Sequence, residues 1–552
     1  MQPGGSNVPK RPLKWGQLQV GQTTDTHGWL EGHLKQPTYS ANWGDFRSFY
    51  DHMNKKAQDL DVDLIWVDCG DLHDGTGFSD NTDPHGLDSM PIYDEVSFDI
   101  MTIGNHELYL ADVTYDMYTN WAKKWGDRYL TSNVLAFNQT SQQYEYIGAK
   151  SRYFTTAHGL RIRAFGVLFT FTGNSNASKI IPAEEMITQP WFTEVLESHD
   201  PVDVFILSGH NAVRPTDPTS TMKVVFDAIR ARHPDTPILV LGGHTHVRDF
   251  IVYDESGVGL EAGRYCETFG WVSLSGFDCS NSGWTGVDNP RGVPNPSRPA
   301  TPDSTSPWVW SRRYLDFSRN SFMYHTQRVE RNFDTSKGLD ISKQIGQVRT
   351  DLNLGEVLGC VPQSFCIFCV EVDDPGSIFS GLLAPAASMI IVNETRAEEA
   401  RFFIINTGAA RYDLPQGPFT IDDIEMVTPF PDVITYIPDV PLALAKQVLA
   451  ELNDGSHPSK RDQQAAVPLT PDACTDPSFA SLQTRDLMDV EIVRRHEALT
   501  PGYNTTDDWG NDGDDIPHNG IPLLTLPDYF GFSANFPDNT EPDVVDLITL
   551  DL

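Results

Sequence analysis

Five short apolar runs in this sequence each end on side chains that bind metal ions in proteins. Imidazole, carboxylate and amide groups are the usual protein ligands of divalent cations such as zinc and manganese. The clusters follow one another along the first half of the chain as Asp25-Thr26-His27, Gly70-Asp71, Gly104-Asn105-His106-Glu107, Gly209-His210 and Gly242-Gly243-His244-Thr245-His246. Together they supply a full ligand set for two adjacent metal ions.

The apolar runs before these clusters have the length and composition of buried strands. They cover residues 18–24, 64–67, 100–103, 204–207 and 238–241. Apolar runs of about four to eight residues closed by Gly and polar residues are typical of strands covered on both faces. Any one cluster alone is more often a turn or a helix cap, since Asp and Gly are common turn residues. Five clusters at the same structural position instead predict a metal site along one edge of a sheet, where open α/β sheets place their sites.

The order of these motifs resembles that of the calcineurin-like metallophosphoesterases. A second resemblance, to the C-terminal domain of the 5′-nucleotidases, rests on Asn406-Thr407-Gly408-Ala409-Ala410-Arg411, Gly417-Pro418-Phe419-Thr420 and Pro429-Phe430. The family pattern there reads Asn-Gly-Gly-x-x-Arg, then Gly-x-aliphatic-Thr, then Pro-Phe. The two resemblances cover both halves of the chain and imply a metal-dependent phosphoester hydrolase.

The resemblance also implies how two metal ions are bound. Asp71 is expected to bridge them, because one anionic ligand must reach both ions. The other ligands are expected to be Asp25, His27 and His246 for the first ion, and Asn105, His210 and His244 for the second. Histidine and carboxylate ligands with an Asn carbonyl suit zinc, or manganese, better than magnesium or calcium.

His106 matches the catalytic histidine of the family, which stabilises charge on the phosphoryl oxygens and the leaving group. A packed core histidine is the alternative interpretation of this residue. In 5′-nucleotidases an Asp three residues later completes a dyad with the histidine, whereas this sequence has Tyr109 there. Either Asp112 or Glu107 orients the imidazole, or the histidine works without a carboxylate partner.

Substrate recognition is expected in the C-terminal domain. Arg411 can fork onto a phosphate or a carboxylate, and Asn406 can hydrogen-bond a base or a ribose. Phe430 resembles the aromatic residue of the family that stacks on the nucleobase, with a core phenylalanine as the alternative. Asp514 aligns with the ribose-binding Asp of the family, in a loop where Trp509 is the nearest substitute for a second aromatic residue.

The predicted fold class is α/β with two domains, because 552 residues are too many for one core. Residues 1–335 are expected to form a metallophosphoesterase domain, a layered β-sandwich flanked by helices, with its closing strands in residues 312–331. A helix over residues 336–352 then bridges to an α/β 5′-nucleotidase-type domain in residues 353–552. A swing about this bridge would bring the base-binding site to the metal ions.

Composition limits the partners of the chain. With 40 Lys and Arg residues against 76 Asp and Glu residues, the net charge is −36, which disfavours binding to a nucleic-acid polymer. Divalent metals and a few Arg residues still allow a small phosphorylated substrate such as a nucleotide. No run approaches the ~18 apolar residues of a membrane span, so no integral membrane segment is expected. The oligomeric state stays open.

The cysteines, sequons and acidity favour a secreted or vacuolar glycoprotein, although residues 1–14 lack the apolar segment of a secretion signal. Cys360, Cys366 and Cys369 lie close together without a second Cys or His cluster, so a local disulfide is favoured over a zinc site. Cys266 and Cys279 are predicted to form a second pair. The sequons stand at Asn138, Asn176, Asn393 and Asn504.

These observations predict a dinuclear-metal phosphohydrolase that removes phosphate from nucleotides or related small phosphomonoesters with metal-activated water. A nucleotide-sugar or 2′,3′-cyclic-nucleotide hydrolase on the same scaffold is the alternative, because the metal centre sets the chemistry and the second domain sets the substrate. A catalytically silent binding protein is disfavoured by the complete ligand set.

Overall fold

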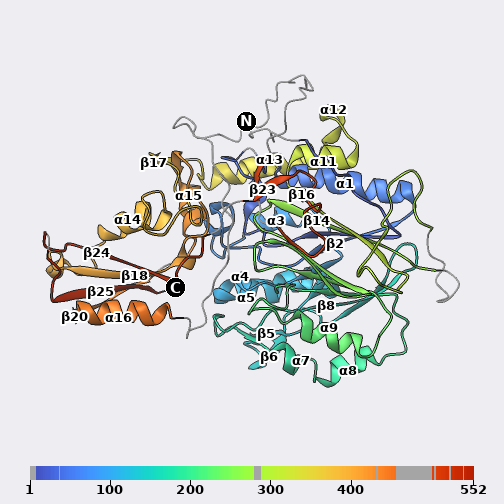
Figure 1. Ribbon diagram of the computed structural model, residues 1–552, viewed down its shortest axis with the longest axis horizontal. Helices are drawn as coiled ribbons and strands as arrows, with labels where there is room; N and C mark the ends of the chain where they lie inside the picture. Colours follow the sequence, from blue (N-terminus) through green and yellow to red (C-terminus); the bar gives the residue numbers. More distant parts are fainter. Residues whose placement is uncertain are drawn as a thin grey trace.

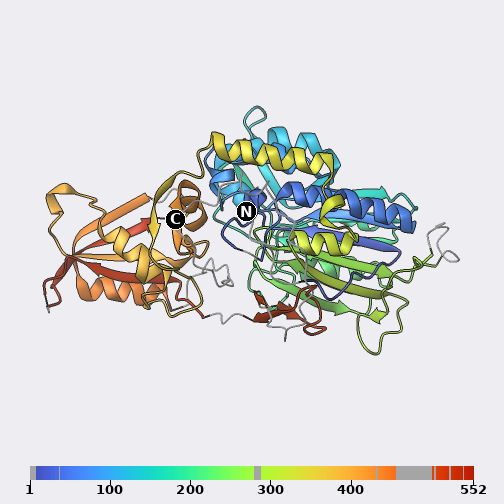
Figure 2. The same cartoon turned by 90° about the horizontal axis from the view of Figure 1, so that it is seen from above.

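The computed structural model has two domains joined by a long helix (Figure 1). The larger N-terminal domain is a β-sandwich with helices on its outer faces, and the smaller C-terminal domain is built on a four-stranded sheet (Figure 2). The predicted α/β fold class of both domains is confirmed. The described residues are 8–36, 38–278, 288–430, 433–454, 500–502, 505–520, 524–538 and 540–551.

Each sheet of the sandwich has seven strands. The first contains, in spatial order, β15 (Arg298–Pro299), β16 (Val309–Asp316), β14 (Thr268–Ser275), β1 (Leu18–Thr23), β2 (Asp63–Asp68), β3 (Ile100–Thr102) and β4 (Tyr129–Leu130). The second contains β22 (Thr505–Asp507), β12 (Arg248–Asp254), β13 (Gly257–Ala262), β11 (Ile238–Gly242), β10 (Val204–Ser208), β8 (Arg161–Gly166) and β7 (Arg152–Thr155). A small third sheet contains β6 (Gln143–Tyr146), β5 (Val134–Asn138) and β9 (Ser178–Ile180).

All five apolar runs predicted as strands form strands, namely β1, β2, β3, β10 and β11. Their inner-face side chains, such as Val20 and Ile65 of the first sheet and Ile206 and Leu241 of the second, share one buried cluster between the sheets. β1, β2 and β3 are parallel to one another, and so are β10 and β11. Parallel pairing therefore puts the ends of the first three strands at one edge of their sheet and the ends of the other two at one edge of theirs.

Helices cover the outer face of each sheet. On the first sheet, Phe46 and Phe49 of α1 pack against Trp66 of β2 and Phe269 of β14. α1 starts at a capping box. The side chain of Asn42 accepts a hydrogen bond from the backbone N–H of Asp45, and the backbone N–H of Asn42 donates one to the side chain of Asp45. The helices of this face are α1 (Trp43–Leu60), α11 (Arg319–Thr326) and α12 (Glu330–Phe333), and those of the second sheet are α7 (Ala183–Met186), α8 (Pro190–Leu196) and α9 (Met222–Arg230).

The segment predicted as a bridge contains helix α13 (Ser336–Asp351), which lies along α1. Gly44 of α1 and Gly338 of α13 meet where the helices cross, and a Cβ on Gly44 would lie 2.3 Å from the carbonyl oxygen of Gly338. Glycine is therefore required for this close approach. Thr335 caps α13 by accepting a hydrogen bond from the backbone N–H of Gly338 at 3.1 Å. The bridge is thus packed on the N-terminal domain.

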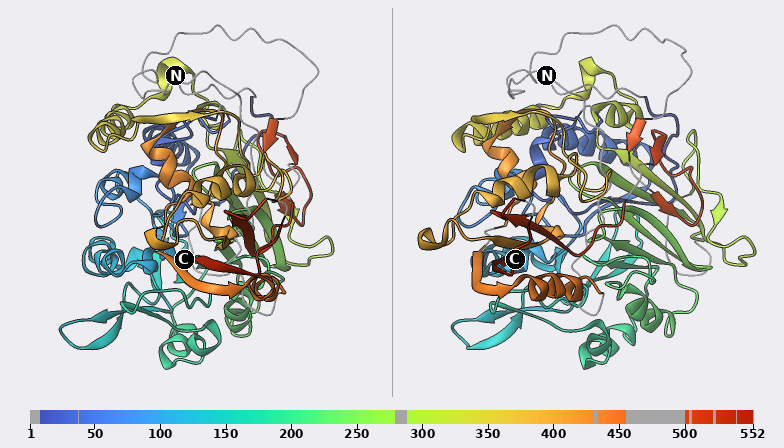
Figure 3. Two further views of the ribbon diagram at one scale, coloured as in Figure 1. Left: turned by 90° about the vertical axis from the view of Figure 1, so that its left-hand side faces the viewer. Right: turned by 60° about the vertical axis from the view of Figure 1, so that its left-hand side comes forward.

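The C-terminal domain has a four-stranded sheet with a helix on each face. Its strands, in spatial order, are β20 (Val433–Pro441), β25 (Val544–Asp551), β18 (Arg401–Asn406) and β24 (Tyr529–Ala534). Phe402 and Ile404 of β18 pack towards α16 (Leu442–Leu452), whereas Phe403 packs towards α14 (Ala384–Ser388) on the opposite face. Figure 3 shows this domain facing the viewer. Two further strands, β17 (Val357–Val361) and β19 (Gly417–Thr420), pair antiparallel, and β19 is followed directly by α15 (Ile421–Val427).

Residues 505–518, which fall within the segment 353–552 predicted as the C-terminal domain, pack on the N-terminal domain. β22 pairs in parallel with β12, and Nε of Arg312 donates to Asp507 at 2.7 Å. The segment continues to β23 (His518–Gly520), which pairs with β21 (Thr500–Gly502), and Figure 2 shows it below the N-terminal domain. Its carboxylates meet buried arginines of the sandwich, and this charge pairing gives the physical reason for the placement.

Only part of residues 312–331 forms the predicted closing strands. β16 ends at Asp316, and α11 follows. Ser318 caps this helix by accepting a hydrogen bond from the N–H of Ser321 at 3.2 Å. Ser at this position is a strong helix start signal, and it explains why strand pairing stops here.

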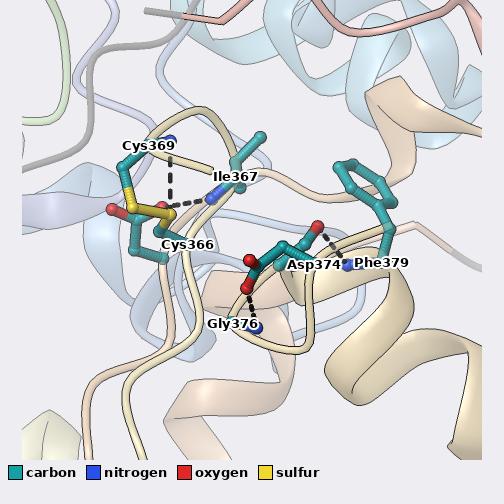
Figure 4. The surroundings of a disulfide bond; sticks show 8 residues. Cys366, Ile367, Cys369, Asp374, Gly376 and Phe379 are labelled. Atoms are coloured by element: carbon teal, nitrogen blue, oxygen red, sulfur yellow. Dashed lines mark hydrogen bonds between the residues drawn. A yellow bond between two sulfur atoms is a disulfide. The ribbon is translucent and has the colours of Figure 1, made fainter. Parts of the chain in front are cut away.

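The predicted local disulfide joins Cys366 and Cys369 (Figure 4). Cys360 is disulfide-bonded as well. The predicted pairing of Cys266 with Cys279 is wrong, because Cys266 is a free, buried cysteine beside the aromatic core, and Cys279 lies outside the described residues.

The sequons differ in exposure. Asn176 is exposed, whereas the side-chain amides of Asn138 and Asn393 donate to tyrosine hydroxyls. Asn504 lies outside the described residues. Among the helices of the described residues, none is both long enough and apolar enough to cross a membrane.

Candidate metal centre

The loops that follow β1, β2, β3, β10 and β11 converge between the two sheets and bring the predicted metal ligands together. Four of these ligands, Asp25, His27, Asp71 and His246, place their ligand atoms within 4.8 Å of one another. All four side chains are buried. Asp25 and His27 follow β1 and Asp71 follows β2, both of the first sheet, whereas His246 follows β11 of the second sheet. The packing of the two sheets therefore brings the four side chains together.

The first half of the centre is defined by short distances among ligand atoms. Nε2 of His246 lies 3.1 Å from Oδ1 of Asp25 and 3.2 Å from Nε2 of His27. Oδ2 of Asp71 lies 3.6 Å from Nε2 of His27. This set is the one predicted for the first ion, with Asp71 facing the second half of the centre.

The second half contains His210, His244 and Asn105. Nε2 of His210 lies 2.9 Å from Oδ2 of Asp71, so Asp71 reaches both halves as the bridging role requires. The rings of His210 and His244 meet edge to face with their centroids 5.3 Å apart. His244 stacks on Phe169 at 4.0 Å, and its backbone N–H donates to Asp25 at 3.1 Å.

Tyr109 orients the amide of Asn105. Nδ2 of Asn105 donates to the hydroxyl of Tyr109 at 2.9 Å, which fixes the amide and leaves Oδ1 as the free end. This Oδ1 is buried and has no hydrogen-bond partner among the described residues. An unsatisfied buried acceptor is costly, and a cation would satisfy it. The amide oxygen thus fits a metal ligand.

Two imidazoles are held with Nε2 towards the centre. Nδ1 of His27 donates to the carbonyl oxygen of His73 at 2.6 Å, and Nδ1 of His210 donates to that of Cys69 at 3.0 Å. Such bonds to the second ring nitrogen fix the tautomer of a metal-binding histidine. Nε2 therefore points at the cluster in both residues.

Several predicted ligands have strained backbone conformations. Positive φ angles occur at Asp25 (51°), His27 (45°), Asp71 (58°), His244 (83°) and His246 (62°). Residues other than glycine adopt this left-handed conformation rarely, and such strain clusters at functional sites. Gly104 makes room for the bridge, because a Cβ there would lie 2.0 Å from Oδ1 of Asp71. The glycine of the Gly-Asn-His-Glu motif is therefore required by the position of Asp71.

The electrostatics of the centre favour bound cations. Burial raises the pKa of Asp25 to about 7, so its charge is penalised until a cation stabilises it. Burial also lowers the pKa of His27 and His246 well below the ordinary value, which keeps these imidazoles neutral as ligands. Although burial alone would raise it, the pKa of Asp71 is held well below its usual range by His210 and His106. The donor set thus fits divalent metal ions.

Asp74, and neither Asp112 nor Glu107, orients His106, the predicted catalytic histidine. Oδ2 of Asp74 accepts a hydrogen bond from Nδ1 of His106 at 2.8 Å. Glu107 instead accepts the backbone N–H groups of Leu72 at 2.6 Å and Gly104 at 2.7 Å, and burial raises its pKa to about 8. Asp112 is exposed on α5 (Ala111–Asp116). His106 therefore has a carboxylate partner, which the loop after β2 supplies.

Arg411 and Phe430 of the C-terminal domain lie against His106. Nη2 of Arg411 is 3.4 Å from Nε2 of His106, and the ring of Phe430 stacks on the imidazole with centroids 6.1 Å apart. The guanidinium of Arg411 lies 5.7 Å from the centroid of Phe430. Both domains therefore contribute to one site, with the predicted substrate residues in contact with the predicted catalytic residue.

Asn406 and Asp514 are engaged in hydrogen bonds outside the group around His106. Asn406 caps the turn η6 (Thr407–Ala409) by accepting the N–H of Gly408 at 2.7 Å. Asp514 accepts a hydrogen bond from Nη1 of the fully buried Arg248 at 2.9 Å, on the N-terminal domain. Its carboxylate is committed to that ion pair, so we do not retain Asp514 as a substrate ligand. Trp509 packs on Phe250 of the same domain, away from Phe430.

The comparisons with known proteins agree with this geometry. The model of the calcineurin-like phosphoesterase family matches residues 18–248, and the model described as NAD nucleotidase, C-terminal domain, matches residues 364–552. A protein of Arthroderma benhamiae named "Secreted protein" is 45% identical over 100% of this chain and 86% of its own length. A protein of Schizosaccharomyces pombe is 39% identical over 98% of this chain and 84% of its own length.

A solved structure covers both domains at once. The crystal structure of a 5′-nucleotidase from Candida albicans matches with a TM-score of 0.83 and 36% sequence identity. The match covers 99% of this chain and 92% of that chain.

Proposed function

We propose a substrate class for this chain, which belongs to the calcineurin-like phosphoesterase family and carries a C-terminal domain of the 5′-nucleotidase type. It is a metal-dependent phosphoester hydrolase. The substrates we propose are nucleotides or related small phosphomonoesters, from which the enzyme removes phosphate. The observation that carries this proposal is the contact of Arg411 and Phe430 with His106 at the metal centre.

Two divalent ions are proposed to occupy the centre, with zinc preferred and manganese as the alternative. Asp71 would be shared, and the remaining ligands would be Asp25, His27 and His246 on one side and Asn105, His210 and His244 on the other. When bound, the ions would supply positive charge for the phosphate oxygens and make water a competent nucleophile near neutral pH.

His106 is proposed as the catalytic group that the protein itself provides. Because its Nδ1–H is donated to Asp74, Nε2 faces the cluster and lies 3.8 Å from Oδ2 of Asp71. From this position Nε2 can hold a proton beside the leaving oxygen and stabilise the charge that develops there. Asp74 also stabilises the imidazolium that forms when His106 takes up a proton.

Arg411 and Phe430 are proposed to bind the two ends of a nucleotide. The guanidinium can fork onto phosphate oxygens beside His106, and the aromatic face can stack on a base. Arg411 is 4% exposed, so an ionic contact to phosphate would be made in a largely dry site, where it is stronger. The Candida relative named as a 5′-nucleotidase supports this substrate class.

A second candidate is hydrolysis of a dinucleotide or nucleotide sugar at its pyrophosphate. It is favoured by the match of residues 364–552 to the C-terminal domain of NAD nucleotidases. A 2′,3′-cyclic nucleotide is the further alternative on the same scaffold. The metal centre would serve any of these phosphoesters, and the C-terminal domain would select among them.

The experiment is a substrate panel with zinc- or manganese-loaded protein. AMP, NAD, UDP-glucose, 2′,3′-cAMP and p-nitrophenyl phosphate would be compared by kcat/KM. We expect the highest value for AMP, and we expect Phe430→Leu, which keeps an apolar side chain without the ring, to weaken AMP more than p-nitrophenyl phosphate. Arg411→Lys, the charge-retaining control for Arg411→Ala, should be the milder change because it loses only the fork. Equal losses for both substrates would reject the nucleotide proposal in favour of a general phosphatase.

We also propose that the protein is secreted. The Arthroderma relative carries the name "Secreted protein", and the bond between Cys366 and Cys369 belongs to an oxidising compartment. The vacuolar alternative has no comparable support. Mass spectrometry of culture supernatant, with and without glycosidase, would test both secretion and the use of the exposed sequon at Asn176.

A further inference from the structure

Behind His106, a chain of hydrogen bonds leads away from the metal centre. Oδ2 of Asp74 accepts a hydrogen bond from Nδ1 of His106 at 2.8 Å, and Oδ1 accepts one from Nδ1 of His85 at 3.0 Å. An ionised carboxylate has no proton to give, so both imidazoles must be the donors. Each oxygen of Asp74 is thereby bound by one histidine.

Asp80 fixes the loop that carries Asp74. Its carboxylate accepts the backbone N–H groups of Asp74, Gly75 and Thr76 at 3.0, 2.6 and 3.2 Å. Both Asp74 and Asp80 are buried, and two such carboxylates repel each other. His85 lies 3.0 Å from the first and 3.8 Å from the second, so its positive charge offsets the repulsion.

The charges on these groups follow from their neighbours. Burial alone would lower the pKa of His85, but Asp74 and Asp80, with Glu425 of α15, raise it to about 9. His85 is therefore a cation at neutral pH. Burial alone would raise the pKa of Asp74, but the hydrogen bonds from His106 and His85 hold it below the usual range. Asp74 is therefore an anion when it accepts the hydrogen bond from Nδ1 of His106.

We propose that His85 is a positioning residue for phosphoester hydrolysis, which holds Asp74 in place so that Asp74 keeps Nε2 of His106 directed at the metal centre. The expected effect of His85 on the rate rests on the proposed function. Its expected effect on the orientation of the His106 imidazole does not depend on the substrate. The participation of Glu425 means that the C-terminal domain also faces this group of charges.

Kinetics of three substitutions test the role of the single hydrogen bond. In His85→Asn the amide nitrogen can replace Nδ1 as the donor to Asp74, whereas His85→Gln and His85→Ala lose a donor at that position. We expect kcat for AMP to fall about 10- to 100-fold in the Gln and Ala variants, the range for loss of a charge-assisted hydrogen bond, and to fall little in the Asn variant. KM and metal content should stay near wild type in all three.

The leaving group gives a readout that a purely structural role would not change. p-Nitrophenolate departs without a proton, whereas the ribose hydroxyl of AMP needs one, so the Ala variant should lose more activity on AMP. His158→Ala is the matched control, because Nδ1 of His158 donates to a carboxylate, that of Asp63, at 2.9 Å on another part of the same domain. This control should leave the ratio of the two activities unchanged.

Nuclear magnetic resonance of ¹⁵N-histidine-labelled, zinc-loaded protein tests the geometry without turnover. The His106 signals, assigned by their absence in His106→Asn, should show a fixed Nδ1–H in wild type and lose it in His85→Ala. Wild-type protein inactive on every phosphoester would reject the proposed function, while this spectrum would still decide the role of His85.

Several results would overturn the inference. One is wild-type kcat in His85→Ala. Another is an equal loss in the Asn, Gln and Ala variants together with loss of metal or of folded protein. Asp74, Asp80 and His85 also lie within 4.8 Å of one another in the manner of a cation site. Three metal ions per wild-type chain and two in His85→Ala would therefore reassign the group to metal binding.

Discussion

Substitution of Asp514 distinguishes the sequence-based role of this residue from the one in the structure. Resemblance to 5′-nucleotidases predicts a ribose ligand at Asp514, whereas the structure shows a partner of the buried Arg248 at 2.9 Å. We therefore expect Asp514→Ala to lower the stability of the N-terminal domain without changing KM for nucleotides. Arg248 retains Asp316 at 2.9 Å as a second partner, so the loss is limited to one charge-assisted hydrogen bond.

The magnitude follows from the kind of bond. A hydrogen bond between charged groups contributes about 1.5–3 kcal/mol. Unfolding of a domain of roughly 330 residues has an entropy of about 0.7 kcal/mol per kelvin, at ~2.1 cal/mol/K per residue. The melting temperature of Asp514→Ala should therefore fall by about 2–4 °C. The loss should exceed that of an exposed ion pair, which is worth about 0–1 kcal/mol.

The assay compares two substitutions in the same segment. Asp512 is the control, because its side chain is 62% exposed although it also pairs with an arginine, Arg312, at 2.6 Å. Calorimetry should show a lower melting temperature for Asp514→Ala and little change for Asp512→Ala. A wild-type melting temperature with KM for AMP raised tenfold or more in Asp514→Ala would refute the structural role and restore the ribose ligand.

Three further predictions concern the centre and its surroundings. Asp71→Ala should lose both metal ions and all activity, because the bridge is the ligand shared by both halves; elemental analysis showing two ions per chain would contradict this. His106→Ala should keep its metals and lower kcat by about 10²- to 10⁴-fold, the range for a positioned acid or base, and unchanged kcat would make the residue structural. Burial raises the pKa of Asp413 from 3.8 to about 7, so the folded protein binds its proton more tightly and loses stability as pH rises between these values. Asp413→Asn should remove this loss, so its melting temperature should fall less between pH 5 and pH 8 than that of the wild type. Melting temperatures of the two proteins that change in parallel with pH would reject the assignment.

The metal half of the site could be predicted from the sequence because its signals are local. Each ligand follows directly after an apolar strand, and parallel pairing of β1, β2 and β3 forces the loops of one sheet to the same edge. The glycines of the motifs are local signals too, since Gly104 makes room for Asp71. Ligand type and strand pattern therefore agree at every cluster, and four of the five clusters also begin with glycine.

The errors concern contacts between segments far apart in the sequence. The sequence does not single out Asp74, because the family spacing places the dyad partner after His106, whereas the loop that carries Asp74 begins 35 residues earlier at Asp71. The one available signal was an Asp three positions after a bridging ligand. The pairing of Asp514 with Arg248 spans 266 residues, and no spacing rule reports such a contact. Tertiary packing brings both pairs together, Asp74 with His106 and Asp514 with Arg248.

The arrangement of the domains bears on how the site is completed. Arg411 already lies 3.4 Å from His106 and Phe430 stacks on it, so both predicted substrate residues contact the predicted catalytic residue in the arrangement that the structure shows. Helix α13, at the expected pivot, is packed on α1 through the Gly44 and Gly338 contact, and its Arg349 binds Glu31 of the N-terminal domain and Asp422 of α15 at 2.9 and 3.0 Å. A pivot held by buried ion pairs on both sides resists rotation, because breaking them would expose or strand charges. In this arrangement Asp74, on the loop after β2, orients His106, and Arg411 and Phe430 of the C-terminal domain pack against its imidazole.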